Sequence, residues 1–195
     1  MEHHGEGGLD MHANLFYGCG TALVTPFRGD RVDYGALEAL IDWQLDSGVD
    51  ALVARLCHVY GPTFTSANSR ADAQFIRKAL AGEDIVMKST GSQVRSFCYV
   101  ADAVSALLTL LVKGGRGQAY NVANRNSVAS IRQYAETLAD IAGVKVAFDV
   151  PPEAEKAGYT KITRAVLNPA KTEALGWRPQ FDLREGLTAT YRCCK

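Results

Sequence analysis

The chain has 195 residues, 47% of them hydrophobic, and its 21 Lys and Arg residues balance 21 Asp and Glu residues to a net charge of zero. This length fits one domain, or one domain and a fragment, with the composition of a soluble globular protein. The neutral charge gives no reason to expect nucleic acid or an anionic membrane as a partner. The longest apolar stretch, Ala103 to Val112, is about half as long as a membrane-spanning helix.

The chain carries five cysteines that form no C-x-x-C pair: Cys19, Cys57, Cys98, Cys193 and Cys194. An odd and scattered set of thiols, with no N-terminal stretch that resembles a signal peptide, predicts reduced cysteines and a cytoplasmic location. We expect residues 193–195 to form a C-terminal tail. The two adjacent thiols on that tail are then free and without function.

Residues 1–15 are polar and glycine-rich, with no hydrophobic period, so we expect them to be disordered. Three histidines lie in this segment: His3, His4 and His12. Isolated histidines without folded groups to orient them seldom bind a metal ion. We therefore predict no metal site in the chain.

Residues 16–53 have the pattern of a strand, a helix and a second strand. Thr21–Thr25 is apolar and partly β-branched, and Asp33 is a candidate N-cap for the helix after it. Gly48 is a candidate C-cap for the same helix. The spacing that indicates one apolar helix face is carried by Leu37, Leu40, Ile41 and Leu45.

Two stretches of this segment resemble the opening of dihydrodipicolinate synthases: Gly20-Thr21-Ala22-Leu23-Val24-Thr25-Pro26-Phe27 and Gly48-Val49-Asp50-Ala51-Leu52-Val53. Those enzymes are (β/α)8 barrels that condense pyruvate with an aldehyde through a lysine Schiff base. The resemblance implies that residues 16–53 are one βα unit of such a barrel and its next strand. The remaining units do not follow, and a barrel closes only with all of them. A lyase of this kind is the alternative function, represented here by an N-terminal fragment alone.

Strand and helix patterns alternate from residue 54 onwards, the order of an α/β fold. Strands are predicted at Leu56–Tyr60, Ile85–Lys88, Phe97–Val100, Ala119–Val122 and Val144–Val150. Helices are predicted at Arg70–Leu80, Asp102–Val112 and Val128–Ile141, with a short one after Pro169 and a last one from Arg184. Two of these helices have a predicted apolar face: Val104, Leu107, Leu108 and Leu111 on one, and Ile131, Ala135, Leu138 and Ala142 on the next.

Four segments of this part resemble the extended short-chain dehydrogenase/reductase family, specifically its nucleotide-sugar epimerases, dehydratases and decarboxylases. They are Arg55-Leu56-Cys57-His58-Val59-Tyr60-Gly61-Pro62, Arg95-Ser96-Phe97-Cys98-Tyr99-Val100-Ala101-Asp102, Tyr120-Asn121-Val122-Ala123, and Leu175-Gly176-Trp177-Arg178-Pro179 with Leu183-Arg184-Glu185-Gly186-Leu187. The resemblance implies a partial doubly wound, Rossmann-like sheet with the family's C-terminal substrate-binding part. We therefore interpret the chain as a hybrid, with a barrel-derived fragment at residues 16–53 and an epimerase/dehydratase C-terminal half at residues 54–192.

The same resemblance implies a cofactor contact at the end of the first strand. In that family the loop there borders the nicotinamide and the sugar, and Cys57, His58 and Val59 hold these positions. The family usually has Asn in place of His58. The alternative for His58 is a strand-end histidine with a satisfied hydrogen bond.

Two arginines are the predicted substrate ligands. Arg95 corresponds to the family's arginine that binds the substrate diphosphate, for which a guanidinium offers planar and permanently charged donors. An ion pair with Asp102 or Glu83 is the alternative for Arg95. Arg164 lies in a stretch similar to one whose arginine meets the nucleotide. Asp102 itself is predicted to be the N-cap of the helix that follows it.

Two features of the family's NAD chemistry are missing from the sequence. The Gly-x-Gly-x-x-Gly turn is absent, and no Tyr-x-x-x-Lys precedes Arg55 by a few tens of residues. Tyr191 and Lys195 have that spacing, but they follow the sugar-binding part, so we interpret the match as chance.

We predict a truncated substrate-binding half with no catalytic residue, no bound NAD, and weak or lost affinity for a nucleoside diphosphate sugar. A non-catalytic assembly module that self-associates through an exposed half-sheet is the remaining alternative.

Overall fold

The computed structural model describes residues 27–28, 31–46, 53–62, 67–150 and 162–195. Its elements in chain order are β1 (Phe27–Arg28), β2 (Arg31–Val32), α1 (Tyr34–Asp46), β3 (Val53–Leu56), β4 (His58–Tyr60), α2 (Ala71–Leu80), β5 (Ile85–Met87), β6 (Val94–Tyr99), α3 (Val100–Lys113), β7 (Ala119–Val122), η1 (Arg125–Ser127), β8 (Val128–Ser130), α4 (Ile131–Ala142), β9 (Val146–Phe148), β10 (Arg164–Ala165), α5 (Ala170–Ala174) and α6 (Leu183–Cys194). The predicted disordered segment, its three histidines and the predicted strand Thr21–Thr25 lie outside the described residues.

The first strand of the α/β part begins at Val53, before the predicted start at Leu56, and changes its neighbour at Cys57. Before this residue, β3 pairs in parallel with β7, from Val53 opposite Ala119 to its last residue. After it, β4 pairs in parallel with β6, with Val59 opposite Cys98. The predicted boundary between residues 16–53 and 54–192 therefore lies directly after the first residue of a strand that continues to Tyr60.

The sheet is mixed, and β6 is its most connected strand. β6 pairs in parallel with β4 and with β10, and antiparallel with β8. β5 and β9 form a separate parallel pair, and β1 and β2 form a short antiparallel pair. Alternating strands and helices with mostly parallel pairing agree with the predicted α/β class.

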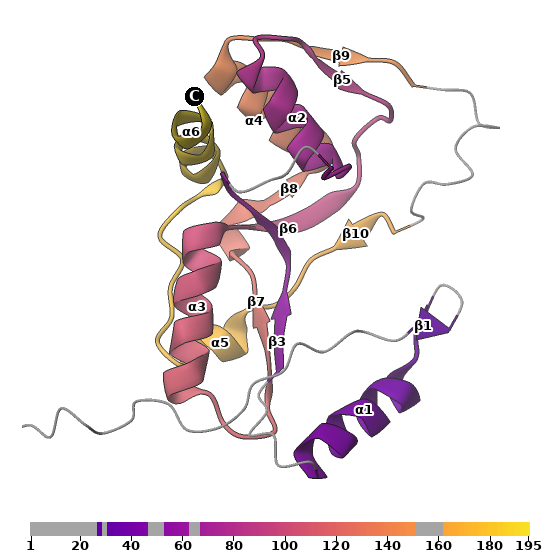
Figure 1. Cartoon of the computed structure of the whole chain (residues 1–195), viewed down its shortest axis with the longest axis vertical. Helices are drawn as coiled ribbons and strands as arrows, with labels where there is room; N and C mark the ends of the chain where they lie inside the picture. The colour runs from indigo at the N-terminus through magenta and orange to yellow at the C-terminus, as the bar shows by residue number, and fades with distance from the viewer. Residues whose placement is uncertain (1–26, 29–30, 47–52, 63–66, 151–161) are drawn as a thin grey trace, which may run out of the picture.

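The larger hydrophobic core lies where α2, α4 and α6 gather around β4, β5 and β6 (Figure 1). Several aromatic rings fill it, among them Tyr60, Phe97 and Tyr134. The ring centroids of Phe97 and Tyr134 are 4.9 Å apart, and Tyr60 meets Tyr134 edge to face at 5.6 Å. The predicted apolar face of α4 is confirmed, since Ala135 and Leu138 are fully buried there.

A smaller core lies between α3 and the strands β3, β6 and β7. Its buried members are Cys98, Ala103, Ala106, Leu110, Tyr120, Val122 and Trp177. The Trp177 indole N–H donates to Ser105 Oγ on α3 at 3.0 Å. Among the residues that the structure describes, no helix is long and apolar enough to cross a membrane.

The apolar face predicted for α3 is wrong. Val104, Leu108 and Leu111 are exposed, and the helix packs through the opposite side, which carries Ala103, Ala106 and Leu110. Small alanine side chains allow the helix backbone to approach the sheet closely. The large residues of α3 are left on the outer surface.

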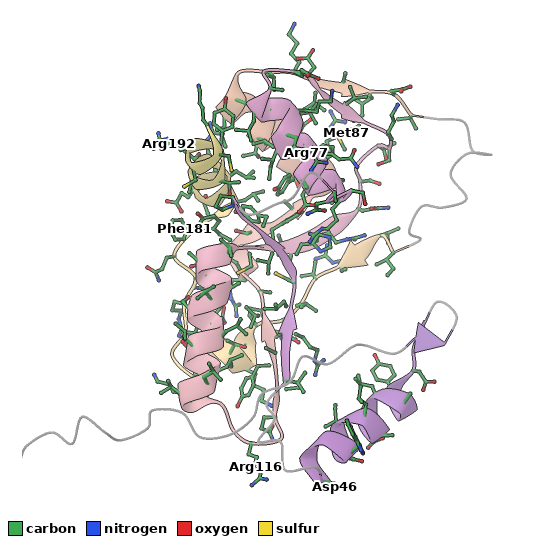
Figure 2. The ribbon with its side chains drawn as sticks, viewed as in Figure 1. Asp46, Arg77, Met87, Arg116, Phe181 and Arg192 are labelled. Atoms are coloured by element: carbon green, nitrogen blue, oxygen red, sulfur yellow. The ribbon has the colours of Figure 1, made fainter. Side chains whose placement is uncertain are left out.

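Asp102 is not an N-cap, because α3 begins two residues before it, at Val100. Its carboxylate is buried and accepts the backbone N–H groups of Gln180 at 2.8 Å and Phe181 at 3.1 Å. The Phe181 ring, which Figure 2 labels between α3 and α6, packs on Tyr99 at 4.8 Å. Asp102 therefore fixes the segment that leads into α6.

The two ends of the chain also differ from expectation. Cys193 and Cys194 belong to α6, and Cys194 Sγ donates to the Pro62 carbonyl oxygen at 3.4 Å, so the predicted tail is wrong for these two residues. At the other end, α1 has the predicted cap, since the Ala36 N–H donates to Asp33 Oδ1 at 3.1 Å. α1 lies apart from the α/β body (Figure 1).

Candidate functional site

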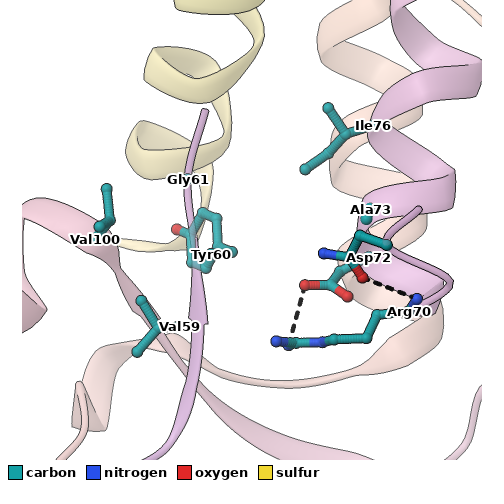
Figure 3. A pocket seen from close by; sticks show the side chains of 9 residues that line it. Val59, Tyr60, Gly61, Arg70, Asp72, Ala73, Ile76 and Val100 are labelled. Carbon is teal, nitrogen blue, oxygen red and sulfur yellow. Dashed lines mark hydrogen bonds and ion pairs between the residues drawn. The ribbon is translucent and has the colours of Figure 1, made fainter. Parts of the chain in front are cut away.

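A small cavity opens at the carboxyl ends of the parallel strands β4 and β6. It has a volume of about 120 Å³ and is lined by residues from the end of β4, from the start of α2 with the residues before it, and from the start of α3: Val59, Tyr60, Gly61, Asn68, Arg70, Asp72, Ala73, Ile76 and Val100 (Figure 3). In open α/β sheets, ligands bind in the crevice outside the carboxyl ends of the strands. The cavity is therefore placed where this fold binds ligands.

The cavity wall is built by close packing on one side and by charge on the other. A Cβ at Gly61 would lie 2.5 Å from a methyl carbon of Val100, so only glycine fits where the end of β4 passes the start of α3. On the α2 side, Arg70 pairs with Asp72 at 3.1 Å, as the dashed line in Figure 3 shows. Sequence reasoning did not select these two residues. Their place just after the Gly-Pro turn of the first strand was the available signal.

His58, a predicted cofactor contact, lies beside this cavity on β4. Its ring meets Phe97 edge to face, with centroids 5.8 Å apart, and part of the side chain is exposed. Partial burial lowers the pKa of His58, and the positive charges of Arg70 and Arg95 lower it further, against the opposing effect of Asp72. The imidazole is therefore favoured in its neutral form, close to two guanidinium groups.

Cys57 and Val59 point to the other face of the strand, because successive side chains alternate. Both pack against the smaller core, so they are less available to a ligand than His58. The neighbouring thiols of Cys57 and Cys98 interact, which lowers the pKa of Cys57 and raises the pKa of Cys98. The Cys98 thiol donates to the Tyr99 carbonyl oxygen, with 3.6 Å between Sγ and O. Val59 also lines the cavity.

Arg95, the predicted diphosphate ligand, is buried on β6, with 6% of its surface exposed. Its guanidinium donates to the Val94 and Ile162 carbonyl oxygens, both at 2.9 Å, and to Gln93 Oε1 at 3.5 Å. The acidic residues considered as its alternative partners bind elsewhere: Glu83 pairs with Lys78, and the Asp102 carboxylate accepts two backbone amides. In this conformation Arg95 ties β6 to the segment that enters β10.

Arg164 lies on β10, next to β6, so the structure brings the two predicted arginines onto neighbouring strands. Arg164 is opposite Val94, and Ala165 is opposite Arg95. Because partners in register share a face, the two arginine side chains leave the sheet on opposite faces. Arg164 is exposed.

The Tyr-x-x-x-Lys spacing at the end of the chain occurs on α6. Lys195 Nζ lies 5.6 Å from the centre of the Tyr191 ring, so the two residues contact each other. Tyr191 is partly buried against the larger core, and neither residue lines the cavity.

A second hollow, of about 570 Å³, lies between α2 and β5 and contains none of the predicted site residues. Two of its lining residues, Lys78 and Glu83, form an exposed ion pair. Within the described parts of the chain, no group of three or more His, Cys, Asp or Glu residues is arranged to hold a metal ion.

The sequence carries no Gly-x-Gly-x-x-Gly pattern of the kind found at the NAD-binding turn of Rossmann folds. NAD binding by a Rossmann fold requires a glycine turn that brings a helix N-terminus to the pyrophosphate. In this structure the glycine at the end of β4 packs against the protein's own Val100, and Cys57 is engaged with Cys98. Of the three predicted cofactor contacts, His58 is the one with an exposed side chain.

Comparison with known proteins gives a consistent answer. Residues 19–123 match the family model described as the NAD dependent epimerase/dehydratase family. UDP-glucuronic acid decarboxylase 5 of Arabidopsis thaliana is 31% identical over 163 residues, which cover 82% of this chain and 45% of the relative. UDP-glucose 4-epimerase of Thermotoga maritima, solved with UDP-glucose, has a TM-score of 0.68 at 26% identity, over 82% of this chain and 50% of that one. The Thermus thermophilus UDP-glucose 4-epimerase solved with NAD has a TM-score of 0.66 at 25% identity, over 80% and 50% of the two chains.

The extent of these matches bears on one part of the sequence interpretation. The family match begins at residue 19, inside the segment assigned to a barrel, and runs on through α1, β3 and α3. The comparisons give no support to the dihydrodipicolinate synthase resemblance, to the barrel unit or to a lyase function. The chain spans about half the length of the curated relatives it matches. Since the family model covers more than half of it, the chain belongs to the NAD-dependent epimerase/dehydratase family.

Proposed function

We propose that this chain is the substrate-binding half of a nucleotide-sugar-modifying enzyme and has no catalytic activity of its own. The observation that supports this most directly is the cavity at the carboxyl ends of β4 and β6, which Arg70 and Asp72 line, with the charges of Arg70 and Arg95 both acting on the nearby His58. Two guanidinium groups and a neutral imidazole favour an anionic ligand, and a nucleoside diphosphate sugar brings such a charge. Relatives that act on UDP sugars support the same substrate class.

The size of the cavity argues for weak binding. Its volume of about 120 Å³ is below the roughly 300–1,000 Å³ of ordinary ligand sites. It has room for part of a nucleotide sugar. Charge pairing in an open cleft is also screened by water and salt. We therefore expect millimolar affinity or less.

We propose no catalysis by this chain, because the residues that begin the family's reaction are missing from the sequence. The family's chemistry requires bound NAD and a tyrosine with a lysine nearby. The chain has no glycine turn for NAD and no suitably placed Tyr-x-x-x-Lys. We expect the purified protein neither to bind NAD⁺ nor to convert a nucleotide sugar. Turnover by the chain alone, lost in Tyr191→Phe, would contradict this and assign a role to the C-terminal pair.

Calorimetric titration with UDP-glucose and with a thymidine diphosphate sugar tests the binding site. Arg95→Ala should weaken binding, and Arg95→Lys, which keeps the charge but not the fork of donors, should weaken it less. Arg184→Ala is the matched control, because Arg184 is exposed, forms an ion pair with Asp140 and does not line the cavity. Micromolar affinity unaffected by Arg95→Ala would remove Arg95 from the site. A discrete oligomer in gel filtration with no ligand binding would instead favour an assembly module.

A further inference from the structure

One edge of β3 points away from its neighbour β7. Toward β7, the Val53 N–H donates to the carbonyl oxygen of Gln118, the residue before that strand, at 2.9 Å. Successive backbone groups of a strand point to alternate edges, so the N–H groups of Ala54 and Leu56 point away from β7. Among the described strands, only β7 pairs with β3. We call the edge that carries these two N–H groups the open edge.

The far edge of β7 is different, because α5 closes it. There the Thr172 hydroxyl of α5 donates to the Asn121 carbonyl oxygen at 2.7 Å. An unpaired strand edge is a template for another strand, because its backbone groups are free to bond. The open edge of β3 is therefore the side on which this strand pair can gain a strand.

We propose that the segment Thr21–Thr25 pairs in parallel with the open edge, so that this segment, α1 and β3 form one β-α-β unit of the sheet. The inference concerns the completion of the sheet and goes beyond the proposed substrate binding. Thr21-Ala22-Leu23-Val24-Thr25 is uncharged, and three of its residues are β-branched. This composition is typical of a strand within a parallel sheet.

The chain between the two strands has the length and the content of a crossover. Parallel neighbours need a connection of about a dozen residues or more, usually with a helix. Residues 26–52 supply this connection and contain α1. The hairpin of β1 and β2 comes just after Thr25 and reverses the chain before α1 begins at Tyr34. A crossover helix runs against the direction of its strands, so this reversal is the one that the unit needs.

α1 then covers the face of β3 that α3 leaves free. α3 packs against the face that carries Ala54 and Tyr120. Side chains alternate along a strand, so Val53 and Arg55 belong to the opposite face. The apolar side of α1 consists of partly buried residues: Leu37, Leu40 and Ile41. With this side on the opposite face, α1 and α3 enclose the strand pair between two helical layers, as parallel sheets normally are.

The position of the hairpin and the family match support the same arrangement. In Figure 1, β7 lies on one side of β3, and α1 and β1 lie on the other. The match to the epimerase/dehydratase family spans residues 19–123, which include Thr21–Thr25, α1 and β3. Both strands of the proposed unit therefore belong to the matched region.

Amide hydrogen exchange measured by NMR tests the pairing, because neighbouring residues of β3 point to different edges. The Arg55 N–H points toward β7 and is the internal reference. In the proposed unit the Ala54 and Leu56 N–H groups bond to the new strand, so all three amides should be protected in the parent chain. Of Leu23→Pro and Val24→Pro, one removes an N–H that faces β3. That variant should speed exchange at Ala54 and Leu56 by about tenfold or more and leave Arg55 protected.

Gly8→Pro is the matched control, because it places the same residue in the polar N-terminal segment, outside the proposed unit. It should leave all three amides unchanged. Cross-strand nuclear Overhauser effects between residues 21–25 and β3 test the same pairing in the parent chain, without a substitution.

Three outcomes would overturn the inference. The first is fast exchange of Ala54 and Leu56 beside a protected Arg55 in the parent chain. The second is protection that neither proline reduces, with no Overhauser effect between the two segments. The third is protection that rises with protein concentration, together with a dimer in light scattering. In that case the open edge pairs with a second copy of the chain.

Discussion

The strand from Val53 to Tyr60 passes through two different environments, one on each side of Cys57. The β4 half pairs with β6 and is enclosed by α2, α4 and α6, with Tyr60 and Phe97 buried in the larger core. Among the described strands, the β3 half pairs only with β7, and Arg55 and Leu56 are exposed. The comparison indicates that the described residues enclose the β4 half in a packed core and leave the β3 half more exposed.

The largest expected effect comes from removing an aromatic ring of the enclosed half. Phe97 contacts His58, Tyr60 and Tyr134 by ring packing, and its side chain is fully buried. Phe97→Ala should lower the free energy of unfolding by about 3–5 kcal/mol, because it leaves a cavity in a packed core. Urea unfolding followed by circular dichroism measures this loss.

Leu56→Ala, in the open half of the same strand, is the matched control. Leu56 is 48% exposed, so its removal should cost less than about 1 kcal/mol. Equal losses in Phe97→Ala and Leu56→Ala would show that the two halves are equally supported. The comparison above would then be wrong.

A smaller loss is expected at Asp102, which connects the two cores. Its carboxylate accepts the N–H groups of Gln180 and Phe181. Asp102→Ala leaves both amides without this acceptor and should cost about 2–3 kcal/mol. Hydrogen exchange should accelerate at these two amides first. Asp102→Asn keeps one acceptor oxygen and should lose about half as much, whereas equal exchange in all three proteins would exclude the link.

The order of the helices and strands could be predicted from the sequence, but which face of each helix packs on the sheet could not always be predicted. Alternation of apolar and turn residues gave the α/β class, and the spacing of Ala135 and Leu138 gave the packed face of α4. The same spacing on α3 marked the apolar side, which is not the packed side. The spacing of apolar residues shows where the large side chains of a helix lie, whereas close packing of a helix on a sheet favours small side chains such as Ala106.

The contacts of the candidate site were harder still to predict, because they join residues far apart in the chain. Asp102 reaches amides 78 and 79 positions later, and Arg95 reaches Ile162. The change of paired strand at Cys57, from β7 to β6, also could not be predicted from the residue types around it. The resemblance located Arg95 and Arg164 on what became neighbouring strands. Only the register places their side chains on opposite faces.

The smallest expected effect concerns the pH dependence of stability and uses His58. The pKa of His58 is lowered from 6.5 in the folded protein, chiefly by burial. The unfolded chain therefore binds a proton there at a higher pH than the folded chain does. As the pH falls from about 6.5 toward the folded pKa, protonation favours unfolding, so stability decreases. Above 6.5 both states are neutral at this position, and His58 contributes no pH dependence.

His58→Asn removes this titration and keeps a polar side chain of similar reach. The variant should lose less stability than the parent chain when the pH falls through this window, and the two curves should run in parallel above it. Urea midpoints at a series of pH values on both sides of 6.5 measure the difference. The histidines at positions 3, 4 and 12 are common to both proteins and cancel. A steeper loss in His58→Asn would mean that protonated His58 is stabilised in the folded state, with Asp72 outweighing Arg70 and Arg95 at the cavity.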